Sequence, residues 1–161
     1  MTHPQKLTLT PELENLLQSF KHIFEEKVLL HKILGLRIES LQLKKVELSF
    51  DMRNEAIGNP TRGMLHGGAI ATVLDAVGGL AVMINILNSK ENIEPEQLLE
   101  SLAEAATIDI RVDYLRPGQG QRFIATGELL KMGTRIAVTR MELHNDEGVL
   151  IAIGTGSYNV S

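Results

Sequence analysis

The chain of 161 residues contains no cysteine and no tryptophan, and it has only two tyrosines and four phenylalanines. The absence of cysteine excludes disulfides, thiol catalysis and thiolate zinc sites, and it suits a reducing compartment such as the cytoplasm. So few aromatic side chains disfavour an aromatic cage or a base-stacking surface. Sixteen basic and twenty acidic residues give a net charge of −4 without a block of one sign. We therefore expect no nucleic-acid partner.

One apolar run is long enough to be mistaken for a membrane span. It covers residues 69–87 (AIATVLDAVGGLAVMINIL), which is within the length range of a transmembrane helix. Asp75 lies near its middle, where a carboxylate costs about 2.5 to 3.5 kcal/mol in a bilayer, and no basic cluster flanks either end. Residues 1–10 lack the apolar region of a targeting segment. We expect a core helix enclosed by protein, no membrane span and a cytoplasmic location.

The pattern around this helix mixes helical and strand periods. Thr10 and Pro11 are a typical helix start, and apolar residues at helical spacing predict an amphipathic helix to about His31, with Gly35 ending the connection. Residues 94–96 (EPE) open a short acidic helix. Alternation and turn residues predict the rest: two strands or one bent hairpin within 36–50, a loop over 51–65, and strands from 107 onward with turns at 117–120, 132–133 and 145–148 before a last strand over 149–160.

These elements indicate one α+β domain. A content of 43% hydrophobic and 22% charged residues is ordinary for a globular protein, and the length suffices for a single core. Five or six largely antiparallel strands and a helix that is apolar on every side imply a curved sheet wrapped around that helix. We expect one domain over residues 1–161, in which residues 1–32 form an N-terminal helical extension.

The start of the core helix carries the first candidate site. His66, Gly67 and Gly68 introduce this helix, and the first N–H groups of a helix have no intrahelical partner and carry the positive end of its dipole. Two glycines put no side chain in front of these groups, so a carbonyl oxygen or an oxyanion can approach closely. The alternative is that the glycines only permit tight packing. His66 either donates to the same carbonyl or orients the loop.

Asp75 is the second candidate. An ionised carboxylate inside an apolar helix is costly unless it is paired, and such groups are often functional. The residues three and four positions away are Ala71, Thr72, Gly78 and Gly79, all small, so Asp75 is expected to project from a shallow groove open to a ligand or another chain. The alternative is a structural Asp75 that binds the neighbouring backbone or Thr72.

The two candidates are too far apart to act together from one helix. Gly67 and Asp75 are eight residues apart, which is about 12 Å along a helix. If both act on one carbonyl carbon, they must come from two copies of the chain related by a two-fold axis. The sequence therefore predicts a homodimer with two equivalent sites at its interface.

Two motifs give the chain a family resemblance. They are NPTRGMLHGG over residues 59–68, followed by Asp75, and TIDIRVDYLRP over residues 107–117. Together they resemble the signature of hotdog-fold acyl-CoA thioesterases, in the phenylacetate-degradation (PaaI-like) group of the 4-hydroxybenzoyl-CoA thioesterase superfamily. The resemblance covers roughly residues 30–160. It implies a hotdog fold, in which a curved antiparallel sheet wraps a long central helix, with edge-to-edge dimers that often pair into a tetramer.

The resemblance also implies roles for single residues. The amide of Gly67 polarises the thioester carbonyl, and the carboxylate of Asp75 from the opposing subunit acts as general base on water or as nucleophile. Asn59 helps to hold substrate or water, and the hydroxyl of Thr107 positions the attacking water. Asn54 is an alternative to Asn59, because the spacing from Asn59 to the histidine is one residue longer than in some relatives.

An acyl-CoA substrate carries phosphates, which require basic groups near the mouth of the site. Arg116, Lys131 and Arg135 lie at strand ends or turns and are the candidates. Gly68 and Thr72 are further candidates for substrate binding. We expect no metal site and no separate cofactor, since coenzyme A is part of the substrate. The remaining histidines, which we expect to be solvated, are His3, His22, His31 and His144.

Three functions remain open from the sequence. The favoured one is an acyl-CoA thioesterase for a medium- or long-chain fatty-acyl or an aryl thioester, since an oxyanion donor, a base and water suffice for that reaction. The others are a non-catalytic acyl-CoA-binding protein and a hotdog enoyl-CoA hydratase or dehydratase, which uses a differently spaced motif. The length of the acyl group and the choice between dimer and tetramer stay open.

Overall fold

The computed structural model of the protein describes residues 11–89 and 105–160. The elements in chain order are α1 (Pro11–His22), the π-helix η1 (Ile23–Lys27), α2 (Leu29–Leu34), β1 (Arg37–Gln42), β2 (Lys45–Asp51), the short 3-10 helix η2 (Asn54–Ala56), β3 (Ile57–Asn59), β4 (Met64–Leu65), α3 (Gly67–Ser89), β5 (Ala106–Tyr114), β6 (Arg122–Met132), β7 (Ile136–Asn145) and β8 (Leu150–Asn159).

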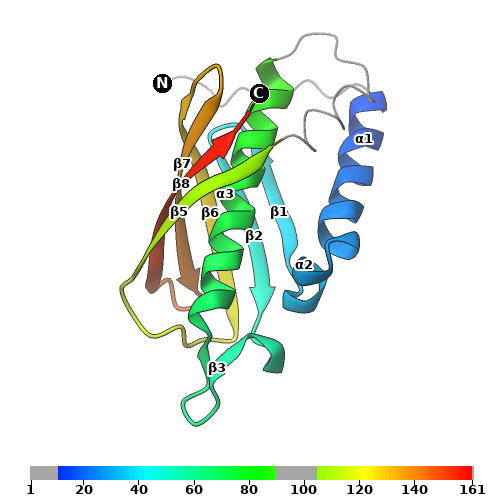
Figure 1. Ribbon diagram of the computed structural model, residues 1–161. Helices are drawn as coiled ribbons and strands as arrows, with labels where there is room; N and C mark the ends of the chain where they lie inside the picture. The colour runs from blue at the N-terminus through cyan, green and yellow to red at the C-terminus, as the bar shows by residue number, and fades with distance from the viewer. Residues whose placement is uncertain (1–10, 90–104, 161) are drawn as a thin grey trace.

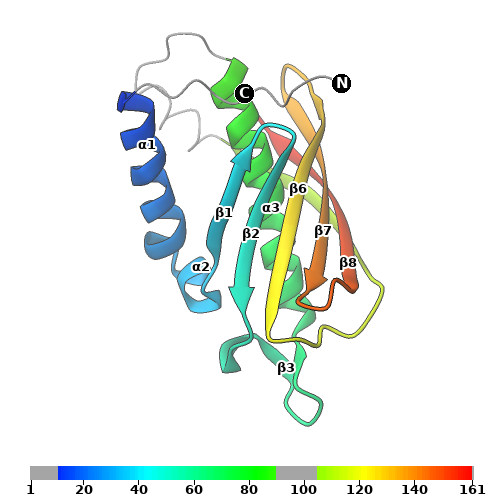
Figure 2. The same ribbon diagram turned by 180° about the vertical axis from the view of Figure 1, so that it is seen from behind.

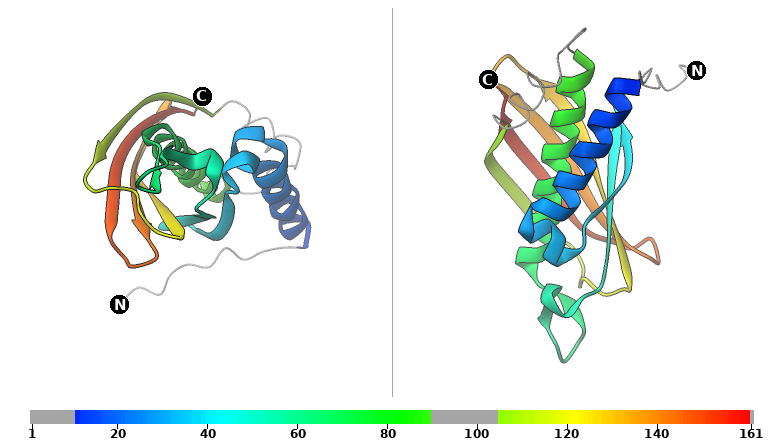
Figure 3. Two further views of the ribbon diagram at one scale, coloured as in Figure 1. Left: turned by 90° about the horizontal axis from the view of Figure 1, so that it is seen from below. Right: turned by 90° about the vertical axis from the view of Figure 1, so that its right-hand side faces the viewer.

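Six of these strands form one curved sheet in the order β1-β2-β6-β7-β8-β5 (Figures 1 and 2). Neighbouring strands are antiparallel throughout this sheet. The strands β6, β7 and β8 follow one another directly, whereas β5 pairs with β8 and forms one edge, opposite β1. The sheet curves around α3 (Figure 3, left). The predicted antiparallel sheet wrapped around a central helix is confirmed.

The helix α3 forms the core together with the inner face of the sheet. Its first 21 residues, Gly67–Leu87, are long and apolar enough to cross a membrane, with a mean hydropathy of 2.0, but 61% of an 18-residue apolar window within them is buried inside the protein. This burial agrees with the expected core helix. Each fully buried large apolar side chain contributes roughly 1.5 to 3 kcal/mol relative to an exposed one. The α3 side chains with no exposed surface include Val73, Leu74, Val77, Leu80 and Ile84.

The loop predicted over residues 51–65 contains more structure than expected. After η2, the strands β3 and β4 pair in a small separate sheet below the start of α3 (Figure 1). The N–H of Leu65 donates to the carbonyl of Gly118 at 3.0 Å, and the N–H of His66 donates to the carbonyl of Ala56 at 2.7 Å. These backbone hydrogen bonds fix the chain at the point where α3 begins.

The N-terminal helix differs from the prediction of one helix to about His31. A π-turn follows α1, and Val28 (φ −77°, ψ 102°) interrupts the helix before α2. Glu25 lies within this π-helix, and its buried carboxylate accepts a 2.8 Å hydrogen bond from the backbone N–H of Ile38 in β1. Gly35 ends α2 with φ 68°, a left-handed conformation that favours glycine.

The N-terminal segment, defined here as residues 11–34, lies beside α3 (Figure 3, right). It stands outside β1, at the end of the sheet opposite β5 (Figure 1). The predicted helix start at Thr10 and the predicted acidic helix after residue 94 lie outside the described residues.

Candidate active site

The start of α3 is held by the side chain that precedes it. The N–H of Gly68 donates a 2.8 Å hydrogen bond to Nδ1 of His66, so the proton of the neutral ring lies on Nε2. This contact corrects the expectation that both glycine amides face a ligand, because His66 occupies the amide of Gly68. The N–H of Gly67, the first helical residue, has no carbonyl to bind within the helix. The candidate oxyanion donor is therefore the Gly67 amide.

Two hydroxyl groups bind the carbonyls of this glycine pair. The Tyr114 hydroxyl donates to the Gly67 carbonyl at 2.9 Å and joins the end of β5 to the start of α3. The Thr72 hydroxyl donates to the Gly68 carbonyl at 2.9 Å. Thr72 thus binds within its own helix and does not line the pocket that contains Asp75. Thr72 was expected near the substrate, whereas Tyr114 was noted only as part of the motif over residues 107–117.

Asp75 and Thr107 meet in the fold although 32 residues separate them. Oγ1 of Thr107, on β5, donates a 2.9 Å hydrogen bond to Oδ1 of Asp75. A hydrogen bond to a charged group contributes about 1.5 to 3 kcal/mol and holds the carboxylate in one orientation. In the described part of the chain, no donor is bound to the other oxygen, Oδ2. Asp75 is half-buried, so a ligand can reach this oxygen.

Tyr158 supports the same turn of α3 from the sheet. Its hydroxyl donates to the backbone carbonyl of Asp75 at 3.2 Å, and the residue is almost fully buried. Burial, and then the negative charge of Asp75, raise the pKa of Tyr158 above its usual value, so the hydroxyl stays a donor. A Cβ at Gly78 would overlap this hydroxyl. Tyr158 therefore fills the expected groove at Gly78, and only Gly79 opens onto the pocket.

A pocket of about 380 Å³ opens beside Asp75. Asp75, Thr107 and Tyr158 supply polar groups to its lining, and the other lining residues are mostly apolar. One wall belongs to α3 and the opposite wall to the N-terminal segment. A pocket of this size, apolar with a few polar groups, is typical of small-molecule sites.

His31 lies in this pocket, and the expectation that it is solvated is wrong. The ring is half-buried at 4.3 Å from the ring of Phe24, and its Nδ1 donates to the Phe24 carbonyl at 3.0 Å. Burial lowers the pKa of His31, and the hydrogen bond and the charge of Asp75 oppose this shift only in part. The spacing from Phe24 through Val28 to His31 was the available signal, since it places all three on one helical face. His22 is exposed, as expected.

Asn59 and its alternative Asn54 both precede α3 and are exposed. Oδ1 of Asn59 accepts a 3.1 Å hydrogen bond from the backbone N–H of Arg62, which closes the turn between β3 and β4. Asn54 begins η2. Neither residue lines the pocket of Asp75.

The three basic candidates do not converge within one chain. Arg116 follows β5 near the start of α3 and donates to the carbonyl of Leu150 at 3.0 Å. Lys131 and Arg135 flank the β6–β7 turn, which lies toward the other end of α3 (Figure 1). All three side chains are exposed. A single chain therefore has basic candidates near each end of α3, but the three side chains do not form one cluster.

The candidate residues form two groups along α3. The first, at its start, contains the Gly67 amide, and the second contains Asp75 with Thr107. Their separation of eight residues corresponds to about 12 Å along the helix. Within residues 11–89 and 105–160, no three histidine or acidic side chains lie together as a metal site. The arrangement provides an amide donor and an oriented carboxylate, which are the groups needed to hydrolyse an activated acyl bond.

Comparisons with known proteins agree with this chemistry. The sequence profile of the Thioesterase superfamily matches residues 62–152. The medium/long-chain acyl-CoA thioesterase YigI of Escherichia coli K12 is 42% identical over 130 residues, which cover 81% of this chain and 84% of YigI. Acyl-coenzyme A thioesterase 13 of Mus musculus is 28% identical, covering 67% of this chain and 69% of its own. A Shewanella oneidensis crystal structure related to the thioesterase superfamily superimposes with a TM-score of 0.88 and 43% identity, covering 95% of this chain and all of that one.

Proposed function

The chain belongs to the thioesterase superfamily and is a thioester hydrolase, and from this premise we propose that it hydrolyses medium- or long-chain fatty-acyl-CoA to the free acid and coenzyme A. Asp75 is the catalytic carboxylate and the Gly67 amide is the oxyanion donor. The acyl class is supported by the name of the Escherichia coli relative and by the apolar pocket beside Asp75. Aryl-CoA thioesters are the competing substrates.

The observation that carries the proposal is the hydrogen bond from Thr107 to Asp75. Because Thr107 holds Oδ1, Oδ2 is the oxygen that accepts a proton from water. The water oxygen attacks the thioester carbon, and the negative charge moves to the carbonyl oxygen, where the Gly67 N–H binds it. The intermediate collapses with cleavage of the C–S bond, and the proton held by Asp75 passes to the leaving sulfur. We propose that Asp75 acts as a general base on water and not as a nucleophile.

The two groups meet only if two protomers share the site, and we propose such a homodimer. The edge strand β5 carries Thr107, and its far side pairs with no other strand among residues 11–89 and 105–160. Exposed fractions of 56% for Ile108 and 53% for Tyr114 are unusual for large apolar side chains on a free strand edge. Pairing of β5 with a second copy covers this edge. A dimer of dimers is the alternative assembly, and a mass measurement will distinguish it from the dimer.

The shared site also gives the basic residues a use. In a dimer with antiparallel central helices, Arg116 of one protomer and Lys131 and Arg135 of its partner approach the same end of the assembly. They are the proposed contacts for the coenzyme A phosphates. We further propose a cytoplasmic location, which suits a cysteine-free chain.

The decisive test measures thiol release from a panel of acyl-CoAs of increasing length together with aryl-CoAs. Asp75→Asn removes the base while keeping the size of the side chain, and we expect kcat to fall by about 10²-fold or more. Asp51→Asn, at an exposed carboxylate outside the site, is the matched control. Undiminished thiol release by Asp75→Asn contradicts the proposal.

The oxyanion donor has its own test. Gly67→Pro deletes the amide at the first helical position, where proline is tolerated, and we expect about a 10²-fold loss of kcat. Gly67→Ala keeps the amide, and its Cβ meets the Tyr114 ring at an ordinary 3.5 Å, so it should retain most activity. Saturable acyl-CoA binding without thiol release would indicate a binding protein instead. Loss of the enoyl-CoA absorbance would indicate a hydratase.

A further inference from the structure

The pocket beside Asp75 has two walls of different origin. The wall on α3 extends from Asp75 to Met83 along the helix that the sheet encloses. The opposite wall belongs to the N-terminal segment, which stands outside the sheet (Figure 3, right). The residues that this segment contributes to the lining are Phe20, Ile23, Phe24, Val28 and His31.

We propose that the N-terminal segment is the wall that determines acyl-chain length, with Phe24 and Val28 limiting the chain that can bind while its thioester reaches Asp75. This inference rests on the proposed function and adds the position of the apolar tail. It makes the helical extension a specificity-determining part of the enzyme.

The exposure of the wall residues supports an apolar occupant. Val28 and Ile23 line the pocket and yet are 39% and 44% exposed, while Phe24 behind them is buried. An acyl chain lying in the pocket would cover Val28 and Ile23. Each methylene group removed from water contributes about 0.8 kcal/mol. The binding free energy of the acyl chain therefore becomes more favourable with each added methylene group until the chain reaches the wall.

The polar groups give the ligand a direction. Asp75 and Thr107 bind each other in one part of the pocket, and the described lining contains no lysine or arginine. On the opposite wall, His31 donates to the Phe24 carbonyl, and burial favours its neutral form. An acyl thioester has the same polarity, with one reactive polar end and an apolar tail. The thioester therefore lies at Asp75 and the tail toward Phe24, while the phosphates stay outside.

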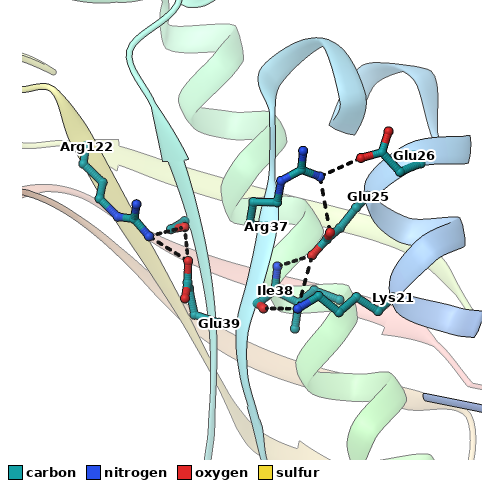
Figure 4. Close-up of polar contacts among 8 residues, drawn as sticks. Lys21, Glu25, Glu26, Arg37, Ile38, Glu39 and Arg122 are labelled. Atoms are coloured by element: carbon teal, nitrogen blue, oxygen red, sulfur yellow. Dashed lines mark hydrogen bonds and ion pairs between the residues drawn. The ribbon is translucent and has the colours of Figure 1, made fainter. Parts of the chain in front are cut away.

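The wall is anchored, so it can discriminate by length. Glu25 directly follows Phe24 and is 8% exposed. Its carboxylate accepts hydrogen bonds from the Ile38 N–H at 2.8 Å and from Nη1 of Arg37 at 3.2 Å, with Nζ of Lys21 at 3.8 Å (Figure 4). Within the π-turn, Phe24 thus faces the pocket while Glu25 faces β1. A fixed wall excludes a chain that is too long, because packed side chains do not move far enough to make room for one more methylene group.

The test compares kcat/KM for butyryl-, octanoyl-, lauroyl- and palmitoyl-CoA. Val28→Phe enlarges a wall residue whose extended backbone accepts any side chain, and we expect the palmitoyl-to-butyryl ratio of kcat/KM to fall by about tenfold or more. Leu29→Phe is the matched control, because Leu29 is 72% exposed and does not line the pocket. Its ratio should stay within about twofold of wild type. Met83→Ala widens the other wall and should raise the ratio.

Binding of laurate gives a readout that is independent of hydrolysis. It should raise the Tm of the wild type and of Leu29→Phe, and raise that of Val28→Phe much less. Equal chain-length profiles and equal laurate shifts for Val28→Phe and Leu29→Phe overturn the inference. If the two variants give that result while the wild type is active and loses its activity in Asp75→Asn, only this inference fails. If the wild type releases no thiol from any acyl-CoA, the proposed function itself fails.

Discussion

At the scale of single residues, the proposed mechanism depends on what each polar side chain near Asp75 binds. The Thr107 hydroxyl is the one side-chain donor that reaches this carboxylate in the described part of the chain. We predict that Thr107→Val lowers kcat by roughly 10- to 100-fold, which corresponds to the loss of one charge-assisted hydrogen bond. Thr107→Ser keeps the hydroxyl and should stay within a few fold of wild type. Undiminished kcat in Thr107→Val, or an equal loss in Thr107→Ser although its hydroxyl is kept, would contradict this role of the hydrogen bond.

His31 makes stability depend on pH. Its folded-state pKa lies below the value of 6.5 for an unburied histidine, so below about pH 6.5 the unfolded chain takes up this proton more readily than the folded one. The free energy of unfolding is therefore highest above that pH and falls as the pH decreases toward the folded-state pKa. His31→Gln removes this contribution and retains a donor for the Phe24 carbonyl.

Urea unfolding at about pH 7.5 and about pH 5.5 measures the effect. The wild type should lose more stability over this interval than His31→Gln, because all other titrating groups are common to both proteins. An identical loss in the two proteins would contradict the burial of a neutral His31.

At the scale of elements, the contact between α3 and β8 involves two adjacent glycines, of which one leaves no room for a Cβ and the other does. A Cβ at Gly78 would overlap the Tyr158 hydroxyl, whereas a Cβ at Gly79 would lie 3.7 Å from the Tyr158 ring. We predict that Gly78→Ala destabilises the protein by about 1 to 3 kcal/mol through overpacking. Gly79→Ala should stabilise it by about 0.4 to 1 kcal/mol, since alanine loses less backbone entropy in a helix.

Urea unfolding of both variants checks this prediction, and a double-mutant cycle identifies its cause. In the Tyr158→Phe background the overlapping oxygen is absent, so Gly78→Ala should cost less. An unchanged cost in that background would place the clash elsewhere, for example at Met141 or Thr139, which also lie close to this position.

The elements also show where a sequence pattern fails. The alternating strands were predicted correctly because the period of apolar residues records which face of a strand is buried, and the central helix was predicted from the length of its apolar run. The N-terminal helix was predicted without its break at Val28. The π-helix before this break contains Glu25, whose carboxylate binds the N–H of Ile38, a contact between residues that no local periodicity relates.

At the scale of the whole molecule, the proposed shared site predicts complementation between two variants that we expect to be inactive. Asp75→Asn retains the Gly67 amide, and Gly67→Pro retains the carboxylate. In a mixed dimer, one of the two sites then combines both intact groups. Unfolding and refolding an equal mixture should restore about one quarter of wild-type activity, because half of the dimers are mixed and half of their sites are intact.

Each variant refolded alone is the control for this experiment and should remain inactive. Mass measurement must show dimers or larger assemblies in every sample. If the mixture stays as inactive as its components while mixed dimers form, both groups act within one chain and the shared site is wrong.

The sequence by itself determined the fold class, the central helix and the residues that carry reactive groups, because these follow from apolar periodicity and from the cost of a carboxylate in an apolar run. Only the tertiary structure decided which groups meet. It paired Thr107 with Asp75, occupied the amide of Gly68 with His66, and brought His31 and Phe24 to a pocket wall. The spacing of residue types places Phe24 and His31 on one helical face, but it does not record that this face meets Asp75. The contacts of Thr107 and His66 depend on the approach of distant segments or on side-chain direction, which the spacing does not record either.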